Sequence, residues 1–428
     1  MNYCIATYRC FDPSADFHKK AQSIAIGLTV GSWTELPAAK QKEMEKHLGK
    51  VLSVEVHEPD RSAGDSGASA DRYSDIRIAY PDVNYNADIP ALLVTVFGKL
   101  SMDGKIKLID LHFSPDFIRS FPGPKFGIAG VRELLGVQDR PLLMSIFKSV
   151  IGHDLAELEK QFFAQAQGGV DLIKDDEILF ENPLTPIEKR VETCMKAAER
   201  AKTETGQKLL YAVNLTGPAS QLAQQAKKAI NAGANALLFN VLAYGFDTLR
   251  ELTADPEINV PIAAHPALAG ALYPSPHYGI SASVLLGKLM RLAGADLVLF
   301  PSPYGSVVMP KEENMAIRHA LVTGELEANY LSGSENVSGS GKVSLRASFP
   351  VPSAGIHPGL VPWIIRDFGT DVVVNAGGGV HGHPMGAAAG GRAFRQAIDA
   401  VMNGKRLADY AQSKPELLAA IERWGAKE

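Results

Sequence analysis

The chain has 428 residues, of which 46% are hydrophobic and 21% charged, and its formal net charge is −4 at pH 7. This composition is typical of a soluble globular protein, and the small negative charge argues against a nucleic acid or an anionic membrane as partner. No apolar run reaches the roughly 20 residues that span a bilayer, and the first residues lack the pattern of a signal peptide. Three scattered cysteines, Cys4, Cys10 and Cys194, show no metal-binding spacing. We therefore expect a cytoplasmic protein.

The first part of the chain, residues 1–122, mixes strands and helices irregularly, which is typical of an α+β domain and here predicts a ferredoxin-like one. One helix is predicted over residues 17–28. Strands are predicted over residues 4–8, 50–56, 74–80, 91–98 and 105–113. Residues 61–72 are rich in Ser, Ala, Gly and Asp and are expected to form an exposed loop. The Pro- and Gly-rich stretch 121–127 marks the end of this domain.

From residue 123 to residue 428 the pattern becomes regular, because each of eight short β-prone runs is followed by a stretch with helical spacing. The predicted strands are 142–147, 169–173, 209–214, 236–240, 260–264, 297–300, 348–351 and 372–375. The predicted helices are 153–167, 186–203, 218–232, 246–252, 281–293, 311–323, 361–368 and 386–401, with a C-terminal helical segment at 406–424. Right-handed crossovers between such units close a parallel sheet, so we expect a (β/α)₈ TIM barrel.

Seven polar residues lie at or just beyond the C-terminal ends of these predicted strands. They are Lys148, Lys174, Asn214, Asn240, His265, Ser353 and Asn375. That end of a barrel is the face that carries active sites. A single polar residue after a strand is explained by solvation, but seven on one rim indicate a site.

The segment Gly168–Glu177 ends a predicted strand in four consecutive charged residues, of which Lys174 is the first. Asp176 and Glu177 offer the hard oxygen ligands that Mg²⁺ prefers. An ammonium at Lys174 would repel a metal. A buried lysine with a lowered pKa, however, can react with CO₂ as a neutral amine and become an anionic carbamate, which would be a third ligand. The alternative is a charged turn whose acids are merely solvated.

The motif Gly-Gly-x-Asp-x-x-Lys-Asp-Asp-Glu in this segment resembles the activation motif of the large subunit of ribulose-bisphosphate carboxylase (Rubisco). The likeness covers almost the whole chain, because Phe97–Leu100, Lys148, Ser353–Pro358 and Gly377–Pro384 follow in the order of that family. Within the family, the chain is most similar to the type IV, Rubisco-like enolases of methionine salvage. The resemblance implies Mg²⁺ held by Asp176, Glu177 and a CO₂-derived carbamate on Lys174.

Further site residues follow from the same resemblance. It assigns proton abstraction to Lys99 and electrostatic binding of substrate oxygens to Lys148, with His265 orienting a substrate oxygen. One phosphate pocket is assigned to Gly355, Gly377 and Gly378, covered by Ser32 and Trp33, with Ser353 on the other side of the substrate. From the residues alone, the run Gly377–Gly379 between a strand and a helix could cradle phosphate or could be a simple tight turn. His381 and His383 are interpreted as loop scaffolding.

Several groups that a carboxylase uses are missing from the chain. Pro266 follows His265 where Rubisco has an arginine, and Met309-Pro310 replace a clear catalytic lysine, although Lys311 lies nearby. We therefore expect no second phosphate pocket, no carboxylation, and an uncharged far end of the substrate facing Pro266, Phe300, Pro301 and Tyr304. The substrate 2,3-diketo-5-methylthiopentyl-1-phosphate meets these demands, and the implied reaction is its enolisation to 2-hydroxy-3-keto-5-methylthiopentenyl-1-phosphate.

Two other functions stay open. Another Rubisco-like enzyme, such as a 5-methylthioribulose-1-phosphate isomerase, would keep the metal and the single phosphate pocket. A non-catalytic phosphosugar-binding regulator would not need a carbamate-built metal site. The resemblance also implies a homodimer with active sites shared between two chains. The Ser/Gly-rich insertion at 326–345 is expected to be a surface loop without assigned function.

Overall fold

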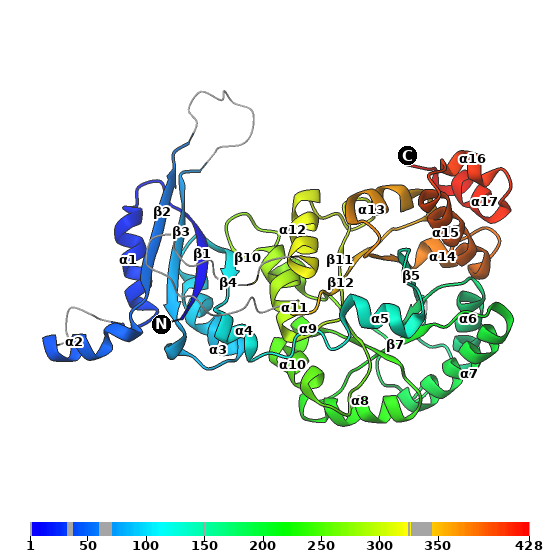
Figure 1. Ribbon diagram of the computed structural model, residues 1–428, viewed down its shortest axis with the longest axis horizontal. Helices are drawn as coiled ribbons and strands as arrows, with labels where there is room; N and C mark the ends of the chain where they lie inside the picture. Colours follow the sequence, from blue (N-terminus) through cyan, green and yellow to red (C-terminus); the bar gives the residue numbers. More distant parts are fainter. Residues whose placement is uncertain are drawn as a thin grey trace. The chain divides into compact units, whose positions relative to one another are not determined.

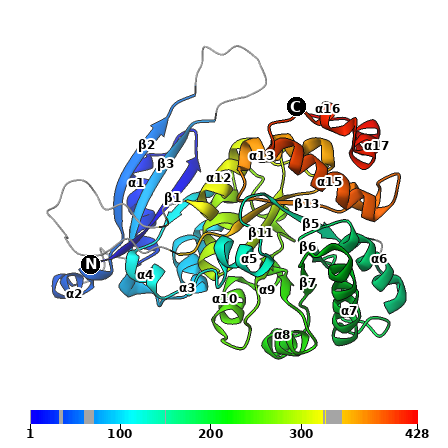
Figure 2. The ribbon, with the colours of Figure 1, turned by 45° about the vertical axis from the view of Figure 1, so that its right-hand side comes forward.

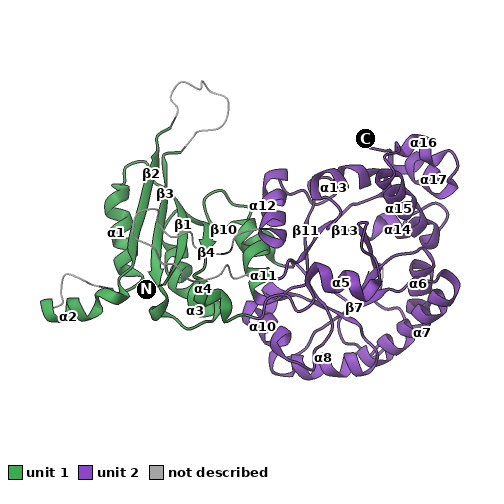
Figure 3. Ribbon diagram, viewed as in Figure 1, with its two compact units in different colours: residues 1–121, 268–292, 324–344 green, residues 122–267, 293–323, 345–428 purple. Residues whose placement is uncertain are grey.

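The computed structural model describes residues 2–31, 37–59, 71–148, 150–323, 326 and 345–427. The chain forms two compact units, coloured separately in Figure 3. Unit 1 draws its described residues from Met1–Phe121, Leu268–Leu292 and Gly324–Ser344, and unit 2 from Pro122–Ala267, Ala293–Thr323 and Leu345–Glu428. Because both units are discontinuous in sequence, the single domain boundary between residues 122 and 123 stays a prediction. Among the described residues, no helix is long and apolar enough to cross a membrane.

Unit 1 is built on a five-stranded sheet in the order β10-β4-β1-β3-β2. Its strands are β1 (Tyr3–Phe11), β2 (Lys50–His57), β3 (Tyr73–Pro81), β4 (Ile106–His112) and the short β10 (Gly279–Ile280). Its helices are α1 (Phe17–Gly27), α2 (Ala38–Met44), α3 (Ile89–Leu93) and α4 (Pro115–Arg119). Helix α1 begins at Asp16, whose side chain accepts from the Lys19 N–H, and packs on one face of the sheet (Figure 1). The expected α+β fold is confirmed.

The strand predicted over residues 91–98 is wrong, because the chain there is helical. Helix α3 continues directly into a π-helical turn, Val94–Gly98. The run of β-branched residues favours a strand, but Asp88 caps the helix through the Ala91 N–H and Pro90 occupies its first turn. The fully or nearly buried residues Ile89, Leu92, Val96, Phe97 and Leu100 recur at helical spacing. Burial of this stripe outweighs the strand propensity of the run.

Unit 2 is the expected barrel of eight parallel strands. They are β5 (Leu142–Ile146), β6 (Leu172–Lys174), β7 (Leu210–Asn214), β8 (Ala236–Phe239), β9 (Ile262–Ala264), β11 (Leu297–Pro301), β12 (Phe349–Ser353) and β13 (Val373–Ala376). The helices of this unit that follow the strands are α6 (Leu155–Gln167), α7 (Ile187–Thr205), α8 (Leu222–Asn231), α9 (Val241–Tyr244), α10 (Phe246–Ala254), α12 (Lys311–Val322), α13 (Val361–Phe368), α14 (Gly378–His381), α15 (Ala387–Met402), α16 (Leu407–Ala411) and α17 (Pro415–Trp424). Helix α11 (Leu289–Ala293) follows β9 in the chain, but its residues up to Leu292 belong to unit 1. Figure 2 shows α6, α7 and α8 outside the strands.

The barrel interior is apolar, and it is filled by every second residue of the strands. These residues are Leu142 and Met144, Leu172, Leu210 and Ala212, Ala236 and Leu238, Ala263, Leu297 and Leu299, Phe349 and Val351, and Val373. Helix α5 (Gly127–Leu135), which precedes the first strand, adds Val131 and Leu135 to this cluster. Side chains alternate between the two faces of a strand, so the interior positions continue in steps of two toward the strand ends.

The strand ladder runs from β12 through β11 and onward to β5 and β13. The Phe349 N–H donates to the Asp296 carbonyl at 2.8 Å, so the donors at positions 349 and 351 face β11. By alternation, positions 350 and 352 face β13, and both are prolines, which have no N–H to donate. A side-chain bond joins the two strands instead, from Asn375 Nδ2 to Ser353 Oγ at 2.8 Å.

Candidate active site

The polar residues at the strand ends form the next interior layer of the barrel. Two residues beyond Leu172, Ala212, Leu238 and Ala263 come Lys174, Asn214, Asn240 and His265. Two beyond Val351 and Val373 come Ser353 and Asn375. The same two-residue period that builds the apolar core therefore places six of the seven polar residues at the strand ends on the interior face of the barrel. Lys148 follows β5 on the same phase, four residues after Met144.

Two lysines neutralise two carboxylates at this end of the barrel. Lys174 Nζ lies 3.4 Å from Glu177 Oε2 and donates to the Asp175 carbonyl at 2.9 Å. Lys148 Nζ pairs with Asp176 Oδ2 at 3.0 Å. Burial lowers the pKa of Lys174, and the charge of Lys148 acts in the same direction against the raising effect of the acids. Burial alone would raise the pKa of Glu177, but Lys174 and Lys148 outweigh it and lower the pKa.

Asp175 takes no part in this cluster, because its side chain points to the other side of the chain. Its carboxylate pairs with Arg190 Nη2 at 3.1 Å and accepts from the Tyr211 hydroxyl at 2.6 Å and the Asn214 N–H at 2.8 Å. Asp175 and Arg190 are both completely buried. This network fixes the residue between Lys174 and Asp176, and therefore the turn that carries both. Sequence reasoning did not identify Arg190 or Tyr211; strand alternation was a signal for Tyr211 in β7, but not for Arg190, which lies in α7.

His265 is neutral and faces the acid cluster. Its Nδ1 accepts from the Ala267 N–H at 3.2 Å, so the proton sits on Nε2, which lies 3.4 Å from Glu177 Oε2. Burial and the charge of Lys174 lower the pKa of His265 to about 3. Asn214 Nδ2 donates to the Glu177 carbonyl at 3.0 Å, and Asn240 Nδ2 lies 3.3 Å from Asn214 Oδ1. The two asparagines therefore hold the backbone that carries the acids.

The first and last strands bring Lys148 next to the predicted phosphate-binding glycines. A Cβ added at Gly377 would lie 2.7 Å from Lys148 Cε, so a larger residue there would displace the flexible end of the lysine. Ser353 Oγ donates to the Val351 carbonyl at 2.8 Å and accepts from Asn375. His381 Nε2 bonds the Ile146 carbonyl at 2.8 Å and His383 Nε2 the Glu416 carbonyl at 2.8 Å. His381, at the end of α14, thus contacts β5, and His383 contacts α17.

The residues expected around an uncharged end of the substrate are arranged differently. Phe300 is completely buried, and its ring packs against Phe368 of α13 with centroids 6.1 Å apart. It occupies an outward position of β11, because Leu297 and Leu299 take the interior ones. Tyr304 donates to Asp367, and Lys311 Nζ pairs with the same carboxylate at 2.9 Å. The Lys311 side chain is therefore ion-paired with a residue of α13.

Lys99 belongs to unit 1, directly after the π-helical turn, and its side chain is exposed. With Lys20, Ile24, Gly27 and Met102 it lines a cavity of about 370 Å³ between α1 and the residues that follow the turn. The Tyr8 hydroxyl donates to the Val96 carbonyl at 2.5 Å and so anchors the turn that leads to Lys99. Ser32 and Trp33, the remaining predicted site residues, lie outside the described part of the chain.

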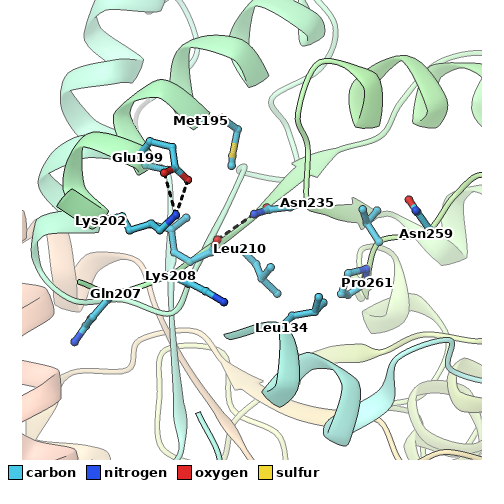
Figure 4. Close-up of a pocket in the computed structure, with 13 residues that line it drawn as sticks. Leu134, Met195, Glu199, Lys202, Gln207, Lys208, Leu210, Asn235, Asn259 and Pro261 are labelled. Carbon is cyan, nitrogen blue, oxygen red and sulfur yellow. Dashed lines mark hydrogen bonds and ion pairs between the residues drawn. The ribbon is translucent and has the colours of Figure 1, made fainter. Parts of the chain in front are cut away.

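A second cavity, of about 340 Å³, lies at the opposite end of the barrel beside the start of β7 (Figure 4). Several of its polar groups already have partners. Asn235 Nδ2 donates to the Leu209 carbonyl at 3.0 Å and Asn235 Oδ1 accepts from the Tyr211 N–H, while Lys202 Nζ lies 3.0 Å from Glu199 Oε2. That end of a barrel serves stability, so the strand-tip cluster is the candidate active site.

The strand-tip cluster fits a divalent cation only if Lys174 changes its charge. Among the residues that the structure describes, no three His, Cys, Asp or Glu side chains gather as a metal site. Asp176 and Glu177 are two oxygen donors, and Lys174 is the buried group next to Glu177. Carbamylation would turn its charge from +1 to −1. Three carboxylate-like groups and the Lys148 ammonium would then balance a dication.

Comparisons with known proteins agree with this geometry. Residues 127–424 match the family model described as ribulose bisphosphate carboxylase large chain, catalytic domain. A protein of Geobacillus thermodenitrificans named 2,3-diketo-5-methylthiopentyl-1-phosphate enolase is 53% identical over 100% of this chain and 99% of its own length. A Bacillus licheniformis protein of the same name is 52% identical, with the same coverage.

Solved structures give the same result. A Rubisco-like protein from Alicyclobacillus acidocaldarius matches 99% of this chain and 100% of its own with a TM-score of 0.87 and 47% identity. The octameric Rubisco of Pyrococcus horikoshii matches 99% of this chain and 95% of its own with a TM-score of 0.85 and 30% identity. The chain therefore belongs to the family of ribulose bisphosphate carboxylase large chains.

Proposed function

We propose that the chain is a Mg²⁺-dependent enolase that converts 2,3-diketo-5-methylthiopentyl-1-phosphate into 2-hydroxy-3-keto-5-methylthiopentenyl-1-phosphate. The observation that carries this proposal is the pairing of two lysines with two carboxylates in the polar layer of the barrel, at Lys148–Asp176 and Lys174–Glu177. The full-length identity of more than half to proteins named for this reaction supports the choice of substrate.

In this proposal Asp176, Glu177 and a carbamate on Lys174 hold Mg²⁺, which when bound supplies a Lewis acid beside the carbonyl oxygens of the substrate. Lys174 is suited to carbamate formation because its buried amine has a lowered pKa and therefore a larger neutral fraction. Lys148 binds substrate oxygens. His265, which is neutral, donates a hydrogen bond from Nε2 to a substrate oxygen.

Lys99 is the proposed base. It takes a proton from C1, the electron pair of that C–H bond becomes the C1–C2 double bond, and the C2 carbonyl oxygen gains the charge and then a proton. The phosphate on C1 is bound by Gly355, Gly377 and Gly378 and covered by Ser32 and Trp33, and Ser353 binds the other side of the substrate. Because Lys99, Ser32 and Trp33 belong to the range of unit 1 and the other groups to unit 2, we propose that two chains of a homodimer share each site.

Proton NMR of the purified protein with the diketone phosphate, Mg²⁺ and bicarbonate tests this function. The expected result is loss of the C1 methylene signal and growth of the enol signal, which Lys174→Met abolishes. Conversion of 5-methylthioribulose 1-phosphate instead would favour the isomerase. Saturable binding of the diketone phosphate without turnover of either compound would favour a regulator.

A further inference from the structure

The loop between β11 and α12, residues 302–310, is closed at its neck. The Ser302 N–H donates to the Ser353 carbonyl at 3.0 Å, and the Met309 N–H donates to the Ser302 carbonyl at 3.2 Å. Ser302 and Met309 are completely buried, whereas Val307 and Val308 at the tip are more than half exposed. The loop therefore emerges from the barrel as a closed unit, with its base bonded to the end of β12.

Asp367 of α13 holds this loop from the side. Its carboxylate accepts a hydrogen bond from the Tyr304 hydroxyl and pairs with Lys311 Nζ at 2.9 Å. The Tyr304 ring packs edge-on against Trp363 with centroids 5.6 Å apart. The Asp367 side chain is only 5% exposed. Burial would raise its pKa, but Arg366, Tyr304 and Lys311 outweigh burial and lower the pKa of the carboxyl well below its usual range. The Asp367 carboxylate thus connects α13 both to Tyr304, near the start of the loop, and to Lys311, directly after its end.

Gly305 and Ser306, before the tip of the loop, pack backbone to backbone against Ala354 and Gly355. A Cβ at Gly305 would lie 1.6 Å from the Ala354 carbonyl oxygen, and a Cβ at Gly355 would lie 2.4 Å from the Ser306 nitrogen. Ala354 has a φ of 70°, a left-handed conformation that costs free energy for any residue with a side chain. Such a conformation persists only where neighbouring contacts impose it. Here those contacts come from loop 302–310.

We propose that Asp367 and Tyr304 are positioning residues for the substrate-binding turn Ser353–Gly355, acting through loop 302–310. Asp367 fixes Tyr304, Tyr304 fixes Gly305 and Ser306, and these hold Ala354 and Gly355 in the left-handed conformation. The role in binding rests on the proposed function, because Gly355 is a proposed phosphate-binding residue and Ser353 a proposed substrate-binding residue. The mechanical link itself does not depend on that function.

The mechanical link is tested by hydrogen exchange on the full-length protein. Tyr304→Phe removes the hydroxyl but keeps the ring on Trp363, and amides in residues 302–309 and 353–356 should then exchange about tenfold faster, since the lost hydrogen bond is to a charged group. Arg366→Gln is the matched control, because Arg366 Nε also bonds Asp367, at 2.9 Å, but lies on the helix and not on the loop. Unchanged exchange at residues 353–356 in Tyr304→Phe would overturn the proposal.

The role in binding is tested by kinetics and by inorganic phosphate as a probe. Tyr304→Phe and Asp367→Asn should each raise KM for the diketone phosphate and weaken inhibition by inorganic phosphate severalfold at nearly unchanged kcat. The double variant should be no worse than the worse single one, because both remove the same contact. Faster exchange with unchanged KM and unchanged phosphate inhibition would overturn the positioning role. If the wild-type protein does not turn over the diketone, the proposed function fails, while exchange and calorimetric phosphate binding still decide this proposal.

Discussion

At the scale of single residues, Lys174 is unusual because its side chain is almost completely buried although it ends in a charge. The sequence suggests a group on the rim, but the structure places it in the polar layer directly above Leu172. Replacement by alanine would therefore leave a cavity as well as remove the amine. Methionine keeps the volume of the side chain and cannot form a carbamate, so it separates chemistry from packing.

Activity is expected to require dissolved CO₂ as well as Mg²⁺, because Lys174 becomes an oxygen ligand only as a carbamate. Enzyme stripped of CO₂ should be inactive with Mg²⁺ and recover on addition of bicarbonate, with a carbamate signal in the ¹³C NMR spectrum from labelled bicarbonate. Lys174→Met should fold, stay inactive and show no such signal. Full activity of the stripped wild-type enzyme without a carbamate signal would refute the role of Lys174.

Tyr211 is expected to matter for metal activation although it lies outside the cluster. Tyr211→Phe removes one donor from the buried Asp175 carboxylate, which should cost about 1–3 kcal/mol of unfolding free energy. Because Asp175 sits between Lys174 and Asp176, the Mg²⁺ concentration for half-maximal activity should rise as well.

The control for this variant is Tyr244→Phe, which removes a comparable hydroxyl bond to the Gly217 carbonyl, 3.0 Å long, without touching Asp175. Stability is measured by urea unfolding and activation by Mg²⁺ titration. Equal activation curves for the two variants would mean that Asp175 only stabilises the barrel.

The site residues can be predicted from the sequence, but the partners that hold them cannot. Lys174, Asp176 and Glu177 stand out because a buried strand ends in charges, and the two-residue period explains why Asn214, His265 and Ser353 join them. Neither the charged strand end nor the two-residue period predicts that Arg190 and Tyr304 bind buried carboxylates. Their partners, Asp175 and Asp367, are 15 and 63 residues away in the chain and come together only in the folded barrel.

At the scale of elements, the regular strand–helix pattern predicts the barrel well because its strands are buried on both faces. Residues 91–98 show the opposite case, where β-branched residues lie in a helix. The start signal was present in Asp88 and Pro90, but a short helix in a mixed domain gives too few turns for its periodicity to stand out. The end of the hydrogen-bond ladder between β12 and β13 is also explained by local sequence, because Pro350 and Pro352 have no N–H to donate.

The cap at Asp88 is expected to influence catalysis, because α3 and the π-helical turn lead directly to Lys99. Asp88→Ala should lower the free energy of unfolding by about 1 kcal/mol and also reduce kcat. Asp154→Ala provides the comparison, since Asp154 caps α6 through the Glu157 N–H at 3.0 Å and should cost similar stability with kcat preserved. The measurements are urea unfolding followed by circular dichroism and steady-state enolisation. Preserved kcat in Asp88→Ala would show that the turn holds Lys99 without the cap.

At the scale of the whole molecule, the proposed base and the proposed metal ligands belong to different compact units, Lys99 to unit 1 and Lys174 to unit 2. A two-fold dimer in which unit 1 of one chain serves the barrel of the other would make two identical shared sites. This arrangement can be separated from a site built within one chain by mixing two inactive variants.

Lys99→Ala and Lys174→Met should each be inactive alone. In a hybrid dimer with shared sites, one site carries both lesions and the other carries neither. Random reassortment at equal amounts makes half the dimers hybrid, each with one intact site, so roughly a quarter of wild-type activity should return. If Lys99 served its own barrel, every site would carry one lesion and no activity would return. The test is to co-express the variants, confirm hybrids by native mass spectrometry, and assay enolisation. Mixing Lys174→Met with Lys148→Met is the control, because both lesions lie in unit 2 and hybrids should stay inactive in a shared-site dimer, each barrel still carrying one of them.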